Sequence, residues 1–358
     1  MNVASQTGER TMSSISKRRI GNTQLEITEL GFGGAPLGNL YTAMTNENAQ
    51  EVIGEAYDNG IRYFDTAPLY GYGLSERRMG LALNSRNRDS FILSSKVGRR
   101  LKPMQPDQVD GVIFEDVPPF QPYFDYSYDG VMRSVEDSLQ RLGLHRIDIL
   151  FIHDVDSVNQ GSTGETERRF REVMEGGYKA LEQLRSEGSV SAIGAGLNEW
   201  EWCQRFAESG DFDCFLLAGR YTLLEQEALD TFLPVCERKK ISVIIGGPYN
   251  TGILATGATK DAYYNYAPAP AEILDRVKRM ETICSQHNVS LAAVALRFPL
   301  CHPAVASVIP GARSMQEIQD NLDIFTTDIP DALWAEFKHE GLLQTDAPTP
   351  SQVCHEDK

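Results

Sequence analysis

The stretch Gly60-Ile-Arg-Tyr-Phe-Asp-Thr-Ala-Pro-Leu-Tyr-Gly71 decides how this chain is expected to fold. Its first half, residues 61–64, is an apolar and aromatic run that is typical of a buried strand. The run stops at Asp65, and the proline and glycine that follow favour a loop. Asp65 and Tyr70 are therefore predicted to lie just beyond the C-terminal end of a strand.

Two later stretches repeat this arrangement. Ser90-Phe-Ile-Leu-Ser-Ser-Lys96 ends in a lysine, and Arg146-Ile-Asp-Ile-Leu-Phe-Ile-His153 ends in a histidine. Strands that alternate with long helical patterns predict a parallel sheet, and a closed parallel barrel carries its active site at the C-terminal ends of its strands. We therefore expect Asp65, Tyr70, Lys96 and His153 to share one site.

The alternation along the whole chain predicts an α/β fold, a single-domain (β/α)8 or TIM barrel over residues 17–342. Flexible tails are expected at residues 1–16 and 343–358, because both ends turn polar. The expected strands are residues 26–33, 61–64, 91–95, 147–152, 191–196, 212–217, 241–245 and 304–309. The expected helices are residues 46–59, 75–83, 131–142, a segment ending near residue 188, 226–239, 271–287 and 314–325.

The long segment between residues 97 and 128, after the third strand, breaks the alternation. It contains several prolines and aromatic residues and shows no clear period. A long irregular insertion in a compact domain is usually functional or disordered, and the aromatic content argues against disorder. We interpret it as a lid beside the substrate pocket, with an insertion that only packs as the alternative.

Composition restricts the partners and the location. The formal net charge of −16 argues against nucleic acid and against anionic membranes, because both require a basic surface. No run is long and apolar enough to span a bilayer, and residues 1–17 lack the apolar centre of a secretory signal, so we expect a cytoplasmic protein. The six cysteines form no C-x-x-C pair, which favours free thiols over a zinc site.

The polar residues at the strand ends suggest proton and hydride transfer. The phenol of Tyr70 has an ordinary pKa near ~10, and an adjacent cation stabilises the phenolate. We expect Lys96, paired with Asp65, to lower the pKa of Tyr70 so that this residue works as a general acid and base. His153 is expected to orient the substrate oxygen. No protein side chain supplies a hydride, so a nicotinamide cofactor is required.

A metal site is the alternative interpretation of the third strand end. His153 is followed by Asp154 and Asp156, which together could ligate a metal in a barrel hydrolase or isomerase. Only one histidine lies there, so we expect no metal.

Three segments of the chain resemble the aldo-keto reductase family over roughly residues 17 to 340. Asp65, Tyr70, Lys96 and His153 match the catalytic tetrad of that family in order and spacing. Arg19-Ile-Gly-Asn-Thr23 is similar to its N-terminal hairpin, and Val308-Ile-Pro-Gly-Ala-Arg-Ser314 is similar to its cofactor segment. The resemblance implies a barrel with an N-terminal hairpin and an NAD(P)-dependent oxidoreductase.

The resemblance also implies cofactor residues, with some departures from the family pattern. Asn198 matches the residue that holds the nicotinamide amide, whereas Leu197, Ala218 and Gly246 replace a serine, a glutamine and a stacking aromatic. Glycine at position 34 leaves room for a ligand near the backbone. The remaining implied contacts are Asp65, a pyrophosphate loop with Pro248, Asn250, Gly252 and Leu254, and a last segment with Ile309, Gly311, Arg313, Glu317, Asp320 and Asn321.

The last segment favours NAD over NADP. Relatives that prefer the phosphorylated cofactor place a lysine and an arginine where this chain has Gly311 and Glu317. An acidic residue suits the free ribose hydroxyls and repels a 2′-phosphate. Arg313 is the counter-evidence, since its guanidinium suits a phosphate.

The segment 246–254 and the long aromatic loop are most similar to a branch of the family that oxidises free sugars at C1, the aldose and fucose dehydrogenases. We therefore expect oxidation of an aldose hemiacetal to a lactone, with Tyr70 and His153 contacting the substrate. A pyridoxal dehydrogenase, or another aldehyde or alcohol dehydrogenase, is the alternative within the family. A metal-dependent hydrolase or isomerase and a cofactor-binding regulatory subunit are the alternatives of another class. A monomer or homodimer with a small-molecule substrate is expected.

Overall fold

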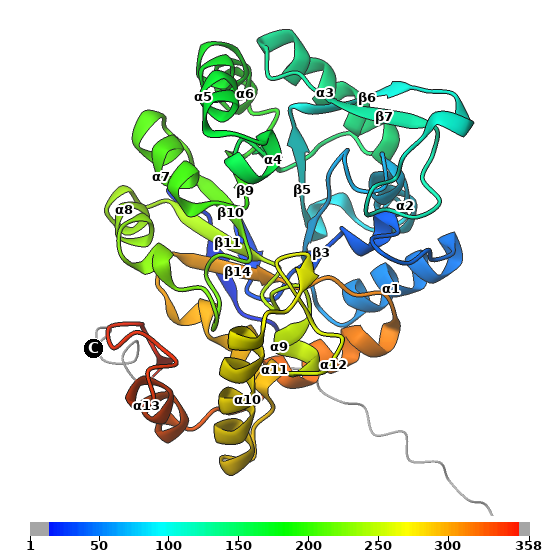
Figure 1. Cartoon of the computed structure of the whole chain (residues 1–358). Coiled ribbons are helices and arrows are strands. Elements are labelled where there is room, and N and C mark those ends of the chain that lie inside the picture. Colours follow the sequence, from blue (N-terminus) through cyan, green and yellow to red (C-terminus); the bar gives the residue numbers. More distant parts are fainter. Residues whose placement is uncertain (1–13, 351–358) are drawn as a thin grey trace, which may run out of the picture.

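The computed structural model describes residues 14–350, in which eight parallel strands form one sheet that closes on itself. Parallel bridges from Leu30 to Val308 and from Gly33 to Gly311 join the first strand to the last. The predicted (β/α)8 barrel is therefore confirmed (Figure 1). In chain order the strands are β3 (Phe32–Gly33), β4 (Tyr63–Asp65), β5 (Ile92–Val97), β8 (Ile149–His153), β9 (Ala192–Leu197), β10 (Cys214–Ala218), β11 (Ser242–Gly246) and β14 (Val305–Ile309).

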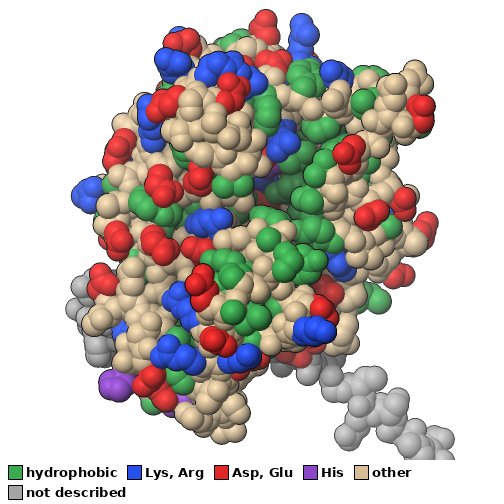
Figure 2. All heavy atoms as spheres, in the orientation of Figure 1, with side chains coloured by type: hydrophobic (Ala, Val, Ile, Leu, Met, Phe, Trp, Pro, Cys, Tyr) green, Lys and Arg blue, Asp and Glu red, His purple; other side chains and the backbone are tan. Residues whose placement is uncertain are grey.

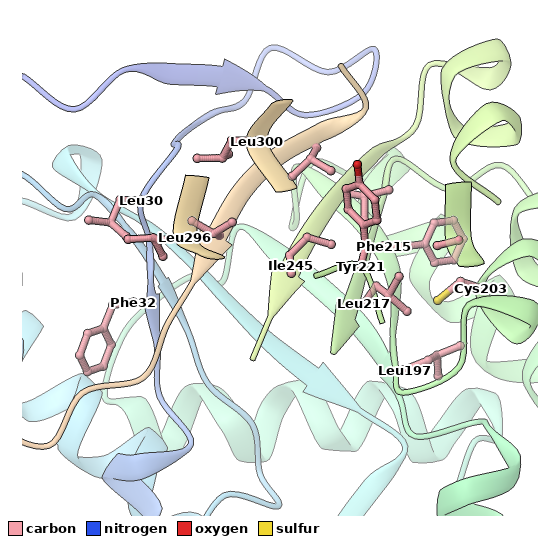
Figure 3. Close-up of a cluster of buried hydrophobic side chains, with 14 of the residues drawn as sticks. Leu30, Phe32, Leu197, Cys203, Phe215, Leu217, Tyr221, Ile245, Leu296 and Leu300 are labelled. Atoms are coloured by element: carbon pink, nitrogen blue, oxygen red, sulfur yellow. The ribbon is translucent and has the colours of Figure 1, made fainter. Parts of the chain in front are cut away.

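Alternate residues of each barrel strand face two different hydrophobic layers. In β10, Cys214 and Leu216 belong to a cluster that fills the barrel, whereas Phe215 and Leu217 belong to the layer between strands and helices. Figure 3 shows Phe215 and Leu217 on the side of Cys203, a residue of the surrounding helices. Burial on both sides explains why the strands read as nearly continuous apolar runs.

Helices surround the barrel, and several of them begin at a residue whose side chain caps the first turn. The side chain of Thr45 accepts from the backbone N–H of Asn48 at the start of the first helix, and Ser127 does the same for Gly130. The helices are α1 (Asn46–Asp58), α2 (Leu74–Leu83), α3 (Tyr128–Leu142), α4 (Ser157–Gln160), α5 (Thr163–Glu172), α6 (Tyr178–Ser186), α7 (Trp200–Ser209), α8 (Phe232–Lys239), α9 (Ile253–Thr256), α10 (Ala271–Gln286), α11 (Leu291–Arg297), α12 (Met315–Phe325) and α13 (Asp331–His339).

The expected first strand, residues 26–33, is two separate elements. Its first part, β2 (Glu26–Thr28), pairs antiparallel with β1 (Lys17–Arg19) in the N-terminal hairpin that the family resemblance implies. Ile20 and Ile27 of this hairpin belong to the cluster inside the barrel. Only the last two residues of the expected strand form β3, so its predicted start was wrong.

The segment between residues 97 and 128 is only partly irregular, because it contains a hairpin. β6 (Arg99–Pro103) and β7 (Phe120–Phe124) pair antiparallel over five residues, from Arg99 opposite Phe124 to Pro103 opposite Phe120. The connection between them reaches the first barrel loop, where Leu40 bridges to Phe114. The alternation of paired side chains in this hairpin is masked in the sequence by its prolines.

A second small hairpin follows the seventh barrel strand. It consists of β12 (Tyr263–Tyr264) and β13 (Ala267–Pro268) and is yellow in Figure 1, where it lies in front of the barrel opening. Asn265 and Tyr266 form its two-residue turn, and both have positive φ angles, 50° and 63°. This combination is typical of a type I′ hairpin turn.

The C-terminal segment differs from the expected flexible tail at its start. Leu343, Ala347 and Thr349 are buried, and the backbone N–H of Gln344 donates to the side chain of Gln226. The other residues expected in tails, 1–13 and 351–358, lie outside the described residues. Among residues 14–350, no helix is long and apolar enough to cross a membrane, and the five cysteines in this range are free and buried.

Candidate active site

A buried ion pair lies at the C-terminal ends of β4 and β5. Lys96 Nζ is 2.6 Å from Asp65 Oδ2 and also donates to the carbonyl oxygen of Thr66 at 3.0 Å. The second carboxylate oxygen of Asp65 accepts from the hydroxyl of Ser94 at 2.7 Å. Lys96 and Asp65 are almost completely buried, so the pair is rigid and shielded from solvent.

Tyr70 and His153 complete the group expected from the sequence. Tyr70 lies in the turn after β4, and Lys96 Nζ lies 4.7 Å from the centroid of its ring. The rings of Tyr70 and His153 are 5.9 Å apart in an edge-to-face arrangement. Three successive strands therefore bring all four predicted residues together, as the parallel barrel requires.

The pKa of Tyr70 differs from the expectation. It is raised well above its ordinary value, first because of burial and then because of the negative charges of Asp65 and Asp154. The expected net lowering of the pKa of Tyr70 is wrong for this structure, because burial and the charges of Asp65 and Asp154 outweigh the ammonium of Lys96, which is paired with Asp65. Tyr70 is therefore a protonated phenol at neutral pH.

His153 is neutral at neutral pH. Burial, followed by the charges of Lys96 and Arg99, lowers its pKa well below its ordinary value. Its backbone carbonyl accepts from the hydroxyl of Tyr126 at 2.5 Å, which fixes the strand end. Its Nδ1 atom is buried without a hydrogen-bond partner among residues 14–350. A neutral imidazole can donate one hydrogen bond to a substrate oxygen.

The two aspartates considered as metal ligands have other partners. Asp154 pairs with Arg99 at 2.5 Å. Asp156 accepts from the backbone N–H groups of Asn159, at the start of α4, and Asn198. Within the described residues, no group of three or more histidines, cysteines and acids has an arrangement suited to a metal ion.

Glycines leave free space beside the ends of β10 and β11. A Cβ atom at Gly219 or Gly247 would meet no atom closer than 3.7 Å, and one at Gly252 would meet none within 4 Å. All three have positive φ angles. Asn250 joins the two loops, because its side chain donates to the carbonyl of Gly219 and accepts from the hydroxyl of Thr222. This cradle fits a ligand that approaches the backbone closely.

Aromatic side chains surround the barrel opening, and among them Tyr41 and Tyr266 are exposed. The ring centroids of Phe114 and Tyr70 are 6.5 Å apart, and Tyr266 lies near both Tyr41 and Tyr70. Figure 2 shows hydrophobic side chains around a hollow on the face that Figure 1 presents. The opening therefore suits a ligand with an apolar ring face.

Comparison with known proteins agrees with this geometry. The aldo/keto reductase family pattern matches residues 29–339. The chain belongs to this family. It is 39% identical to pyridoxal 4-dehydrogenase of Microbacterium luteolum, over 93% of this chain and 99% of that protein. It is 37% identical to D-threo-aldose 1-dehydrogenase of a Pseudomonas species, over 90% of this chain and 96% of that protein.

Solved structures support the same fold. An aldo-keto reductase of Bacillus halodurans in its holo form aligns with a TM-score of 0.71 and 25% identity, covering 92% of this chain and 97% of that one. A glycerol dehydrogenase of Gluconobacter oxydans aligns with a TM-score of 0.70 and 21% identity, over 93% and 97% of the two chains, and shows the fold alone.

The nicotinamide cofactor of the aldo-keto reductases fits the cradle, and the expected contacts around it divide into two groups. Pro248 and Leu254 are buried, so neither presents an exposed side chain to the cofactor. Gly34 is buried as well, and a Cβ atom there would lie 2.5 Å from the carbonyl oxygen of Asp65, so the space beside it is filled by the protein and not left for a ligand as expected. Asn198 is partly buried, and its side-chain oxygen accepts from Asn159 at 3.5 Å.

The second group lies at the end of β14 and on α12. Arg313 donates to the carbonyl of Leu40, and Glu317 accepts from the backbone N–H of Arg313 at 2.8 Å. The side chains of Asp320 and Asn321 accept from Gln316 and Tyr249, respectively. Ile309 is buried, and Gly311 is exposed beside Pro36. Glu317 is therefore also a cap that holds the first turn of its helix.

Two groups at the opening were not predicted from the sequence. Arg99 lies at the start of a strand that was expected to be a loop, and Tyr266 lies at the tip of a hairpin that no pattern indicated. Asp154 was considered only as a metal ligand. Its position directly after His153 was the available signal.

Proposed function

We propose that this aldo-keto reductase transfers a hydride between a nicotinamide dinucleotide and the C1 carbon of an aldose-type hemiacetal, giving a lactone. The observation that carries the proposal is the buried Lys96–Asp65 pair beside Tyr70 and a neutral His153, next to the glycine cradle. Similarity to an aldose 1-dehydrogenase over nearly its whole length supports the sugar.

Pyridoxal is the second candidate substrate, because a pyridoxal 4-dehydrogenase is similar at 39% identity. The two substrates have related chemistry. The aldehyde of pyridoxal closes onto its neighbouring hydroxymethyl group to form a cyclic hemiacetal, as the aldehyde of a sugar closes onto its own hydroxyl. Oxidation of either hemiacetal gives a lactone, and the apolar rim of the opening suits the ring face of both.

The oxidation requires a hydride acceptor and a proton acceptor. A nicotinamide dinucleotide held beside the glycine cradle would supply the hydride acceptor for C1, and its positive charge in the oxidised state would favour the phenolate of Tyr70. Tyr70 then takes the proton of the C1 hydroxyl as the C1–O bond becomes a carbonyl. His153 donates a hydrogen bond that holds the same oxygen. In the reverse direction Tyr70 returns the proton.

A substrate screen tests this function. Purified protein is incubated with a panel of aldoses, with pyridoxal and with simple alcohols, each with NAD and with NADP, and the reduced cofactor is measured. We expect rapid reduction with one or more aldoses and identify the product as a lactone. Oxidation of the simple alcohols without any oxidation of aldoses or pyridoxal contradicts the proposal. Cofactor binding without turnover identifies a regulatory subunit, and loss of activity with a chelator identifies a metal enzyme.

We propose NAD as the preferred cofactor, because Gly311 and Glu317 offer no cation to a 2′-phosphate, while Arg313 is already bonded to the carbonyl of Leu40. A methylglyoxal reductase of Escherichia coli that is NADH-specific is 25% identical over 96% of its length.

Glu317→Arg tests the cofactor choice, with Glu317→Gln as the control that keeps a hydrogen-bond acceptor for the cap. We expect Glu317→Arg to raise the NADP/NAD ratio of kcat/KM about tenfold or more, which corresponds to ~1.4 kcal/mol. The control is expected to change the ratio much less. A wild type that prefers NADP, or an unchanged ratio in Glu317→Arg, contradicts the assignment.

A further inference from the structure

Asp154 has an unusual backbone conformation at the end of β8. Its φ angle is +59°, in the left-handed region that residues other than glycine rarely adopt. Only 5% of the residue is exposed. Strained conformations of this kind are found most often at functional sites, where the surrounding structure holds them in place. This conformation fixes the position of the Asp154 carboxylate.

The two carboxylate oxygens of Asp154 face two functional groups. Oδ1 lies 3.4 Å from Nε2 of His153, and Oδ2 lies 2.5 Å from Nη1 of Arg99. The charge of Asp154 also acts on the phenols of Tyr70 and Tyr266. The carboxylate therefore lies on the side of the residues that hold the substrate.

A purely structural role explains this arrangement less well. A buried ion pair contributes little to stability compared with apolar packing, because both charges must be desolvated. Asp156, two residues later, has the contacts of a structural residue, since it caps α4 and holds the backbone of Asn198. Within residues 14–350, the side chain of Asp154 accepts no hydrogen bond from a backbone N–H group.

We propose that Asp154, together with Arg99, binds the hydroxyl group on C2 of the aldose and determines specificity for 2-hydroxylated hemiacetals. Oxygens on neighbouring sugar carbons are separated by about one hydrogen-bond length, similar to the 3.4 Å between Asp154 Oδ1 and His153 Nε2. When His153 holds the C1 oxygen, the C2 hydroxyl reaches the carboxylate. A hydroxyl both donates and accepts, so the carboxylate and the guanidinium satisfy both capacities. This inference rests on the proposed aldose oxidation.

The first test needs no variant. We compare kcat/KM of the wild type for an aldose and for its 2-deoxy counterpart. A site built to bind a hydroxyl discriminates strongly against an analogue that lacks it, because its buried polar groups lose their partner. We expect the wild type to prefer the aldose by about 10- to 100-fold.

Asp154→Asn removes the charge and one acceptor while keeping the size of the side chain. We expect kcat/KM for the aldose to fall by about 10- to 100-fold, while the value for the 2-deoxyaldose changes little, so that the ratio approaches one. Asp156→Asn is the matched control on the same loop. It is expected to affect both substrates equally and to leave the ratio at its wild-type value.

The outcomes separate this inference from the proposed function. Aldose oxidation with a wild-type ratio near one overturns the role of Asp154 and leaves the proposed function intact. Equal loss with both substrates in Asp154→Asn also overturns it. If Asp154→Asn does not fold, the role of Asp154 is decided by the wild-type ratio and by the same comparison in Arg99→Lys. This variant keeps the ion pair but changes the donor geometry. Oxidation of neither aldose nor pyridoxal overturns both.

Discussion

Tyr70 shows how burial and the net charge around a side chain, and not one neighbour, decide its pKa. Lys96 lies against its ring, but the ammonium is paired with Asp65 at 2.6 Å, and Asp154 adds a further negative charge. The phenol is therefore protonated in the free protein. Oxidation needs the phenolate, so we expect its rate to rise with pH, whereas reduction, which needs the phenol, falls at high pH.

Replacing Tyr70 with phenylalanine removes the proton acceptor and leaves the ring. We expect turnover to fall by roughly two to four orders of magnitude, the usual contribution of a general acid–base group. Cofactor affinity, measured by fluorescence titration, is expected to change little, because the glycine cradle is untouched. Near-normal turnover of Tyr70→Phe contradicts the assignment of Tyr70.

Replacing Lys96 with methionine leaves Asp65 without its partner. The phenolate of Tyr70 then loses its nearest cation, so its pKa rises further, and the pH profile of oxidation moves to higher pH. We expect residual turnover to be low at neutral pH and to increase towards alkaline pH. Lys102→Met, at an exposed position of β6, is the control and is expected to keep the wild-type profile. An unchanged profile in Lys96→Met shows that Lys96 does not act on the phenol.

At the scale of elements, the sequence predicted the barrel strands well because they are buried on both sides. The apolar run before Asp65 and the run before His153 end where the strands end. The prediction failed where pairing depends on distant residues. Glu26–Thr28 joins the hairpin and not the barrel because of its antiparallel partner, which local pattern does not reveal.

Dependence on distant residues also explains which interactions of the site were not predicted from the sequence. The position of Asp154 follows from the strand end, but its interaction with Arg99 depends on the start of the β6–β7 hairpin. The expected role of the segment between residues 97 and 128 as a mobile lid stays a prediction. Phe114 lies against Tyr70, as such a lid requires.

Gly80 and Gly54 offer a matched test of helix packing. A Cβ atom at Gly80 in α2 would lie 1.8 Å from the carbonyl oxygen of Leu142, at the end of α3, whereas one at Gly54 in α1 would meet no atom within 4 Å. Alanine forms helices better than glycine by ~1 kcal/mol. We expect Gly54→Ala to be neutral or stabilising by up to about 1 kcal/mol, and Gly80→Ala to destabilise by roughly 1–3 kcal/mol because α2 must move away from α3.

Urea unfolding of both variants measures these differences. The opposite signs are the essential result, since both changes add the same methyl group to a helix. Equal effects on the free energy of unfolding indicate that α2 and α3 adjust without cost, contrary to the close contact at Gly80.

For the whole molecule, acid stability depends on groups that fold into the interior without a charge. His302 is buried, and burial lowers its pKa to about 4. Its Nδ1 atom accepts the backbone N–H of Ala304 at 3.2 Å, which requires the neutral ring. Glu237 lies 3.5 Å from Nε2, but its side chain is 44% exposed, so solvent screens the attraction that would otherwise raise the pKa.

The sign of the pH dependence follows from this lowered pKa. Between pH ~6.5 and about 4 the unfolded chain binds a proton at His302 that the folded chain does not, so stability decreases as the pH falls through this window. Between pH 7 and 5 the loss from this one residue is about 2 kcal/mol. His302→Asn keeps an acceptor for Ala304 and does not titrate, so its free energy of unfolding should fall by ~2 kcal/mol less than that of the wild type between pH 7 and 5.

His339→Asn is the control, because it changes a histidine whose side chain is 84% exposed. Its free energy of unfolding is expected to follow that of the wild type. The carboxylates of this acidic chain titrate in all three proteins and therefore cancel. If the unfolding free energies of wild type and His302→Asn run parallel over this range, His302 is not held neutral in the folded protein.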